Sequence, residues 1–265
     1  MQKLKWKKIR TFERGFMATH LINIGSKLGV FEKLNEKKEE GLNVADLATE
    51  LGVHEPYLKF WCQTAYHFEL LDCDDQGKFK LQPFLDEILD KGIKFLDIGC
   101  GNGSLIIQFA NAFENSKFVG INPDVHGVDA AKATISQLGL EERVTVEHIG
   151  GEKISYKDEF DMVSMVVTLH EILPDIRESV VDKAKQALKS GGCIMILDFP
   201  YPNNLKDFRN PMYEYGIMDQ FYETAIGTVH LNNIEQNELL TKAGFKDIQR
   251  MPVGKGMFDF ITATK

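Results

Sequence analysis

The residues with the clearest chemical potential lie in the stretch FLDIGCGNGSL, residues 95–105. Asp97 comes first, and Cys100 and Asn102 then alternate with glycines. Glycine permits positive φ and removes a side chain that would keep a ligand from the backbone, and a helix N-terminus offers free N–H groups. The spacing therefore predicts a ligand held against the chain at Gly99, Gly101 and Gly103, with Asp97 suited to its cationic part.

A second candidate is His170, which follows the apolar run FDMVSMVV in the segment TLHEIL. An imidazole with an ordinary pKa near 6.5 suits proton removal around neutral pH. The alternative is a histidine that only packs or caps a loop. Glu171 is adjacent in sequence, so it can orient His170 only if the segment is irregular, because neighbouring side chains on a helix diverge. His230 is a spare base candidate.

The sequence shows no spacing typical of a metal site. His126, His148 and His170 fall in separate predicted loops, and neither an HxxxH pair nor paired carboxylates occur. We therefore predict a metal-independent reaction. The cysteines are widely scattered without a CxxC pair, which predicts reduced thiols; they are Cys62, Cys73, Cys100 and Cys193.

The sequence from Lys94 onward predicts the strands and helices that would hold these residues in place. Apolar strand-like runs alternate with helical segments, a pattern typical of a mostly parallel sheet with helices on both faces. FLDIG reads as a buried strand and GNGSLIIQFANAF as the amphipathic helix after it, so the glycines lie at the carboxyl edge, where open parallel sheets bind ligands. A dinucleotide turn would read GxGxxG, but position 104 is Ser, which disfavours NAD. The predicted strands are KFLDIG, KFVGIN, RVTVEHI, FDMVSMVVT, CIMILDF, KDIQRMPV and MFDFITATK.

The motif DIGCGNG resembles the first motif of class I S-adenosylmethionine-dependent methyltransferases. KFVGIN, FDMVSMVVTLHEI, LKSGGCIMILDF and KAGF resemble later landmarks in family order. The resemblance covers residues 91–265 and implies a Rossmann-like, seven-stranded sheet that binds S-adenosylmethionine. By position, the residues around the methionine part of the cofactor are Asp97, Gly99, Cys100, Gly101, Asn102 and Gly103.

The chain departs from the family pattern at two cofactor positions. The second strand ends at Asn122, where the family has an acid for the ribose hydroxyls; Asp124 is a substitute if the loop allows. After the third strand, Gly151 takes the place of the acid near adenine, and Glu152 is displaced by one residue. A neutral amide makes weaker hydrogen bonds than a carboxylate, so these changes predict a lower affinity or a shifted adenosine.

The LHE segment is similar to the histidine–acid pair of O-methyltransferases, which implies O-methylation with His170 as general base. A long segment rich in aromatic residues, Met, Pro and Asn follows the fifth strand, and connections of this length are often lids. The alternative is a helix that packs on the sheet. The candidate substrate-lining residues are Tyr201, Phe208, Met212, Tyr215, Met218 and Phe221.

Residues 1–90 predict a separate helical domain. Apolar spacing indicates helix from Leu4 to about Gly41. The chain then predicts a capped short helix, a turn at Gly52, a second helix from near Glu55 and two short strands. This is the order of elements in a winged helix. Lys59 is the only strong base among aromatic residues on the second helix, which favours packing over DNA binding. The arrangement is similar to small-molecule O-methyltransferases and implies a homodimer whose first domain also helps to cover the substrate; PFLDEILDKGIK marks the boundary.

The charge and hydropathy of the chain limit the classes of partner that it can bind. The 265 residues carry a formal charge of −8, and residues 1–94 are balanced, so the negative excess lies in the second domain and disfavours nucleic acid. No unbroken apolar segment suggests a signal peptide or membrane span, and a cytoplasmic location is the default expectation. The predicted partner is a small-molecule methyl acceptor. Two alternatives stay open: a non-catalytic, cofactor-binding regulator, and an enzyme of the same fold that uses S-adenosylmethionine for other chemistry.

Overall fold

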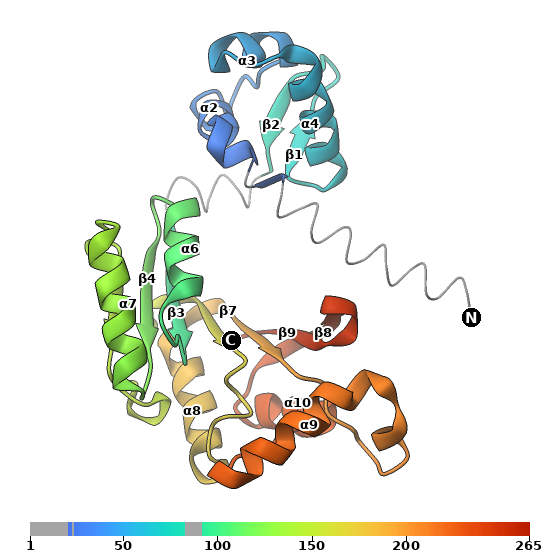
Figure 1. Ribbon diagram of the computed structural model, residues 1–265. Helices are drawn as coiled ribbons and strands as arrows, with labels where there is room; N and C mark the ends of the chain where they lie inside the picture. The colour runs from blue at the N-terminus through green and yellow to red at the C-terminus, as the bar shows by residue number, and fades with distance from the viewer. Residues whose placement is uncertain (1–20, 23, 83–91) are drawn as a thin grey trace. The chain divides into compact units, whose positions relative to one another are not determined.

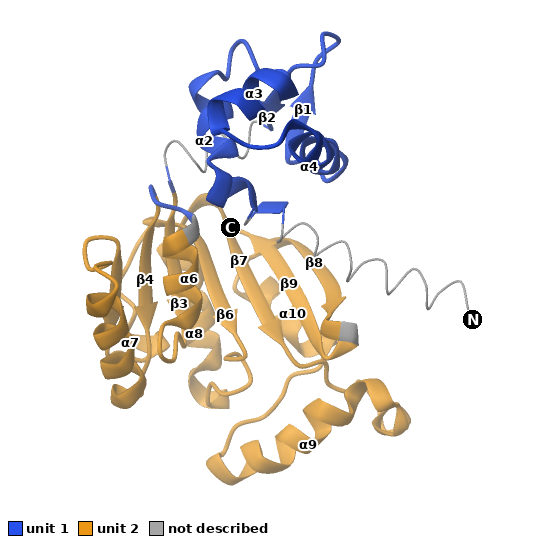
Figure 2. Cartoon of the chain, turned by 45° about the horizontal axis from the view of Figure 1, so that its top comes forward, with its two compact units in different colours: residues 1–92, 112–115 blue, residues 93–111, 116–265 orange. Residues whose placement is uncertain are grey.

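The computed structural model describes residues 21–22, 24–82 and 92–265, and within this part the chain divides into two compact units. The first comprises Met1–Gly92 with Ala112–Asn115, and the second comprises Ile93–Asn111 with Ser116–Lys265 (Figure 2). The predicted boundary segment falls largely on residues 83–91, outside the described residues.

In its described residues, the first unit contains α2 (Val30–Glu36), α3 (Val44–Leu51), α4 (Glu55–His67), further helical residues at 24–28 and a two-stranded antiparallel sheet of β1 (Leu71–Cys73) and β2 (Phe79–Leu81) (Figure 1). The side chain of Asn43 caps α3 by accepting from the Asp46 backbone N–H, and Gly52 ends it at φ +65°. The helix-turn-helix and hairpin order matches the expectation, and the winged-helix assignment stays a prediction.

The helix predicted from Leu4 to Gly41 can be compared with the structure only in part, because residues 1–20 and 23 lie outside the described residues. Within the described residues it is not one helix. Gly29 adopts φ +71° and precedes α2, which ends at Glu36. A left-handed residue breaks the i to i−4 hydrogen-bond ladder, so the apolar periodicity continues across a turn that the spacing alone does not reveal.

The second unit is built on a seven-stranded sheet, which confirms the predicted α/β class. The strand order is β5-β4-β3-β6-β7-β9-β8; the first five pair in parallel, and β9 pairs antiparallel to both β7 and β8. The strands are β3 (Lys94–Ile98), β4 (Lys117–Ile121), β5 (Val144–Glu147), β6 (Phe160–Val166), β7 (Leu188–Asp198), β8 (Lys246–Val253) and β9 (Phe258–Thr264).

Helices cover both faces of this sheet (Figure 1). The main core joins the apolar sides of α8 and α10 to the central strands, where residues such as Val181, Leu240 and Ile196 are fully buried. Across the described residues, no helix is both long and apolar enough to cross a bilayer. The helices are α6 (Ser104–Ala112), α7 (Val125–Gln137), α8 (Pro174–Ala187), α9 (Glu214–Glu223) and α10 (Asn233–Lys242).

The parallel strands end at one edge of the sheet, and this register gathers the predicted functional residues. β3 and β4 pair through Ile98 and Ile121, so the glycine turn and Asn122 leave the sheet side by side. β6 pairs with β7 up to Val166 and Leu197, which brings the His170 loop beside the end of β7. Ligands bind at this carboxyl edge in open α/β sheets.

Candidate active site

Asp97 is a buried acid at the end of β3, with 3% of its surface exposed. Its carboxylate accepts a hydrogen bond of 2.5 Å from the Ser164 hydroxyl on β6. Burial raises the pKa of Asp97 to about 7, although the Ser164 hydrogen bond works in the opposite direction. A desolvated carboxyl of this kind is suited to a positively charged ligand group that would restore its charged form.

The three glycines of the turn after β3 differ in what a side chain at each position would contact. A Cβ at Gly99 would meet the Thr168 side chain at 2.4 Å, and one at Gly103 would meet the Ala131 Cβ at 3.1 Å. These two residues allow packing within the protein. A Cβ at Gly101 would meet nothing within 4 Å, and its φ of +52° disfavours other residues. Gly101 is therefore the position where a side chain would project into open space.

Two predicted cofactor residues of the same turn have structural side chains. The Cys100 side chain is buried against β4, and a Cβ at Gly120 would meet its Sγ at 2.7 Å. The Asn102 Oδ1 accepts hydrogen bonds from the Ser104 hydroxyl at 2.6 Å and from the Ser104 backbone N–H, at the start of α6. A cofactor contact from either residue would have to come from its backbone.

A cavity of about 420 Å³ opens beside this turn and gathers the predicted adenosine positions. Such a volume lies in the range of small-ligand pockets. Its lining includes Gly99, Asn122, Gly151, Glu152 and Thr168.

Asp124, the expected substitute for the ribose acid, caps the helix that follows β4. Both carboxylate oxygens of Asp124 accept backbone N–H groups, of His126 at 3.1 Å and of Gly127 at 2.9 Å, and so cap α7. The start of the helix uses this carboxylate as its cap, and a role of Asp124 toward the ribose stays a prediction.

His170 forms a buried pair with Asp198, the last residue of β7. The distance from His170 Nδ1 to Asp198 Oδ1 is 2.5 Å, and the two side chains are 3% and 1% exposed. Asp198 also accepts the backbone N–H groups of His170 and Phe199. Because the carboxylate accepts on this side, Nδ1 carries the hydrogen and the lone pair of the ring lies on Nε2.

Sequence reasoning named Glu171 as the only adjacent orienting acid and did not identify Asp198. The segment around His170 is indeed irregular, since α8 begins only at Pro174, but the structure gives the orienting role to Asp198. Burial lowers the pKa of His170, whereas the hydrogen bond and charge of Asp198, with the charges of Glu171 and Asp219, raise it; the result is above the ordinary value. Asp198 could have been found as the acid that ends β7, the strand paired with β6, which precedes the His170 loop.

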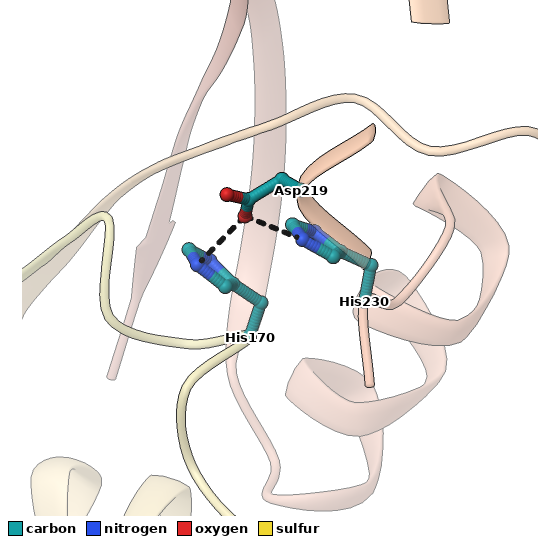
Figure 3. Close-up of side chains that lie close together, drawn as sticks. All are labelled: His170, Asp219 and His230. Atoms are coloured by element: carbon teal, nitrogen blue, oxygen red, sulfur yellow. Dashed lines mark hydrogen bonds and ion pairs between the residues drawn. The ribbon is translucent and has the colours of Figure 1, made fainter. Parts of the chain in front are cut away.

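The other face of His170 meets residues of the long segment after β7. The ring stacks on His230 with centroids 4.3 Å apart and planes 8° from parallel. Asp219 on α9 bridges the Nε2 atoms of the two rings, with its Oδ2 3.0 Å from His230 Nε2 and 3.6 Å from His170 Nε2 (Figure 3). Burial and the charge of His170 lower the pKa of His230, which therefore favours the neutral form.

Arg177 on α8 connects these parts of the site. Its guanidinium, 4% exposed, donates to three backbone carbonyls: to His170 at 3.1 Å, to Ile172 at 2.7 Å and to Val229 at 2.7 Å. It thus ties the loop that carries His170 to the segment that carries His230. Sequence reasoning missed Arg177, because a basic residue on a helix usually lies at the surface.

The structure gathers some of the predicted lid residues around this cluster and leaves others apart. Tyr201 stacks on His230 and contacts Phe208 edge-on, and Tyr215 lies against Phe199, itself beside His170. The alternative of a helix packed flat on the sheet does not fit α9, whose described residues include only Gly216 as buried. Met212, Met218 and Phe221 are exposed, and Phe221 contacts Tyr222.

We expected no metal site because His126, His148 and His170 fall in separate loops. Among the described residues, His170 instead lies with Asp219 and His230, and the ligand atoms of these three lie within 4.8 Å of one another. His230 lies 60 residues from His170 along the chain. The spacing rules for metal sites detect only ligands that are close in sequence.

Comparisons with known proteins agree with this architecture. Residues 96–194 match the family described as a methyltransferase domain. The chain is 26% identical over 193 residues to an uncharacterized methyltransferase of Synechocystis sp., covering 73% of this chain and 85% of that protein. It is 32% identical over 132 residues to the 27-O-demethylrifamycin SV methyltransferase of Amycolatopsis mediterranei, covering 48% of this chain and 47% of that protein. These matches identify a methyltransferase domain and support the class I, S-adenosylmethionine-dependent methyltransferase fold.

Several solved methyltransferase structures have the same fold as this chain. The S-adenosylmethionine-dependent methyltransferase SibL superposes with a TM-score of 0.55 at 18% identity, covering 95% of this chain and 96% of that one. An O-methyltransferase from neocarzinostatin biosynthesis, crystallised with S-adenosylmethionine and 2-hydroxy-5-methyl naphthoic acid, gives 0.54 at 13% identity and covers 92% and 95%. At such identities the likeness concerns the fold, and S-adenosylmethionine is the cofactor of the family.

Proposed function

We propose that the protein transfers the methyl group of S-adenosylmethionine to a hydroxyl group of a small-molecule acceptor, with His170 as general base. The observation that carries this proposal is the His170–Asp198 pair. Its hydrogen bond fixes the Nδ1–H form, which directs a lone pair at Nε2 away from Asp198. A histidine held in this way is equipped to take the hydroxyl proton.

The residues present fit the cofactor. Asp97 offers a buried carboxylate for the ammonium of the methionine part, and the open side of Gly101 leaves the backbone accessible to its carboxylate. The cavity lined by Asn122, Gly151 and Glu152 would take the adenosine. When bound, S-adenosylmethionine supplies an electrophilic methyl group on a sulfonium.

The protein's own part in the reaction is to position and to accept a proton. Methyl transfer requires the acceptor oxygen, methyl carbon and sulfur in line, so orientation contributes much of the rate. As the hydroxyl proton moves to His170 Nε2, the imidazolium that forms is stabilised by Asp198, just as the raised pKa of His170 indicates. Arg177 holds the His170 loop in place through its carbonyl contacts.

The aromatic residues near His230 support a planar or apolar acceptor. Of the predicted lining, Tyr201 stacks on His230, Phe208 contacts Tyr201, and Tyr215 lies against Phe199. The similarity in sequence to the 27-O-demethylrifamycin SV methyltransferase and in fold to the O-methyltransferase of neocarzinostatin biosynthesis is in keeping with methyl transfer to an oxygen.

The His170→Ala variant tests the base. We expect S-adenosylhomocysteine binding to stay within about threefold of wild type, whereas turnover falls by about 10²–10⁴-fold, the usual contribution of general acid–base catalysis. Turnover is measured as S-adenosylhomocysteine release with a panel of phenols, catechols and hydroxynaphthoic acids. Wild-type turnover should rise with pH through the raised pKa of His170, since the base must be neutral. An active variant that keeps the wild-type pH profile would remove His170 from this role.

A second candidate is chemistry other than methylation in the same fold. The [4+2]-cyclase SpnF superposes with a TM-score of 0.51 at 18% identity, covering 67% of this chain and 77% of that one. Mass analysis of the product separates the two: methylation adds one methyl group and consumes S-adenosylmethionine, whereas a cyclisation leaves the mass of the substrate unchanged.

A further inference from the structure

The cluster of His170, Asp219 and His230 has the donor set of a transition-metal site. Two imidazole nitrogens and one carboxylate oxygen come from three separate segments and converge within 4.8 Å (Figure 3). Zinc and other borderline divalent ions are bound by imidazole and carboxylate at single sites, often with three protein ligands and an open position.

The surroundings orient these ligands as metal sites require. Metal-binding histidines usually donate their second ring N–H to a carboxylate or carbonyl, which fixes the tautomer and raises the basicity of the ligand. His170 does so through Nδ1 to Asp198 at 2.5 Å. The backbone of His230 is held by a 2.6 Å hydrogen bond to the Gln220 side chain on α9, next to Asp219. Asp198 therefore orients the ring of His170, whereas Gln220 holds the backbone of His230 and leaves its ring able to turn.

One adjustment is needed for an ion to bind. The two rings are nearly parallel, and an ion lies near the plane of each imidazole that binds it, so one ring must turn out of the stack. Rotation of an imidazole about its Cβ–Cγ bond is a broad torsion with little intrinsic preference. The hydrogen that His230 shares with Asp219 must also move from Nε2 to Nδ1, which neutral imidazole permits.

Access to the cluster comes from the side of Asp219. The two histidine side chains are almost fully buried, whereas the Asp219 side chain is 26% exposed. An ion entering there would neutralise Asp219 and meet the ring nitrogens that converge on this carboxylate, with its open position toward the exposed side.

We propose that His170, Asp219 and His230 bind one divalent transition-metal ion of the zinc type. The ion uses the Nε2 lone pair of His170, and the same lone pair cannot accept a proton from an acceptor hydroxyl. The metal-bound protein is therefore an inhibited form with respect to the proposed base. Protons compete for the same nitrogens, so the affinity falls as the pH is lowered.

The test is a cobalt titration of the full chain after treatment with EDTA and dialysis, followed by the visible absorption of bound Co²⁺ and by calorimetry with Zn²⁺. We expect one saturable site. Asp219→Asn and His230→Gln should each weaken binding at least about tenfold, since each removes a ligand. His126→Gln is the matched control, because His126 lies on the first turn of α7, exposed and away from the cluster, and it should bind as wild type does.

Folding is checked separately by S-adenosylhomocysteine binding and by the thermal midpoint of each variant. Asp219→Asn keeps the shape of the side chain at a partly exposed position, so it remains informative even if His230→Gln does not fold. The proposal is overturned if wild type shows no saturable Co²⁺ band, or if Asp219→Asn binds Co²⁺ as tightly as wild type and His126→Gln do. Neither result depends on whether methyl transfer is detected.

Discussion

At the scale of single residues, the glycines and acids at the strand ends decide what this methyltransferase can bind. Asp97, Gly101 and His170 were predictable because each lies directly at the end of an apolar run, where the strand sets its position. Asp198, Asp219 and Arg177 were not, because their roles depend on pairing between segments 28 or more residues apart or on the burial of a charged side chain. The roles of the predicted site residues toward the cofactor stay predictions.

The raised pKa of Asp97 predicts a proton released on cofactor binding. The carboxyl has a pKa of about 7 without ligand, and an ammonium group beside it would stabilise the charged form and lower that pKa. At pH 6 binding of S-adenosylhomocysteine should therefore release up to one proton, and at pH 8.5 this release should vanish. Calorimetry in buffers of different ionisation enthalpy measures it. Asp97→Asn should bind without this release; an unchanged release in that variant would assign the proton to another group.

Gly101→Val should block the cofactor through the side chain it adds. Gly139→Val is the matched control, because Gly139 also has positive φ, +67°, and open space around its Cβ, but lies at the turn after α7. Both changes should cost about 1–2 kcal/mol of unfolding free energy from backbone strain. Only Gly101→Val should lose S-adenosylhomocysteine binding, by more than about tenfold. Equal affinities in the two variants would show that the open side of Gly101 does not face the cofactor.

At the scale of elements, the ends of β6 and β7 and the segment after β7 make the site together. The strand-like runs predicted all seven strands, most clearly the five parallel ones, since buried parallel strands read as continuous hydrophobic sequence. They could not predict that β7 begins at Leu188, because Leu188 pairs with Phe160 across a register shift that only the assembled sheet produces. The path of α9 was also beyond prediction, since few of its residues are buried and its contacts with His230 are polar.

Arg177 should act through the position of the His170 loop. Arg177→Lys keeps the charge, but one ammonium cannot span the carbonyls of His170, Ile172 and Val229. We expect turnover to fall about 100-fold, as for a misplacement near 1 Å, with little change in S-adenosylhomocysteine affinity. Arg143→Lys is the control, since Arg143 also donates to a carbonyl, that of Ala110, on another part of the unit. A change in cofactor affinity as large as the change in turnover would contradict a positioning role.

At the scale of the whole molecule, the first unit carries features of an association surface. Tyr57 and Phe60, three residues apart on α4, are 78% and 68% exposed, and an apolar cavity of about 430 Å³ adjoins them. Large exposed aromatic residues of this kind often mark interfaces. These features support the expected homodimer, which stays a prediction.

Phe60→Lys tests that dimer. Sedimentation velocity of wild type should give the mass of two chains, and the variant should shift toward one, because a charge at the centre of an apolar interface is desolvated without a partner. Tyr222→Lys, at a similarly exposed aromatic residue on α9, should stay dimeric. A wild-type chain that sediments as a monomer at all concentrations would dismiss the interface.

The order of strands in the sheet also has a consequence for synthesis on the ribosome. β9 lies between β7 and β8, although it is the last of the three to be translated. A nascent chain that has emerged as far as Val253 holds β8 with no neighbour to pair with, and its β7 presents an open edge. The sheet is completed in one late step, when residues 258–264 fill the gap between the two. A chaperone that shields exposed strand edges would be most useful during that interval.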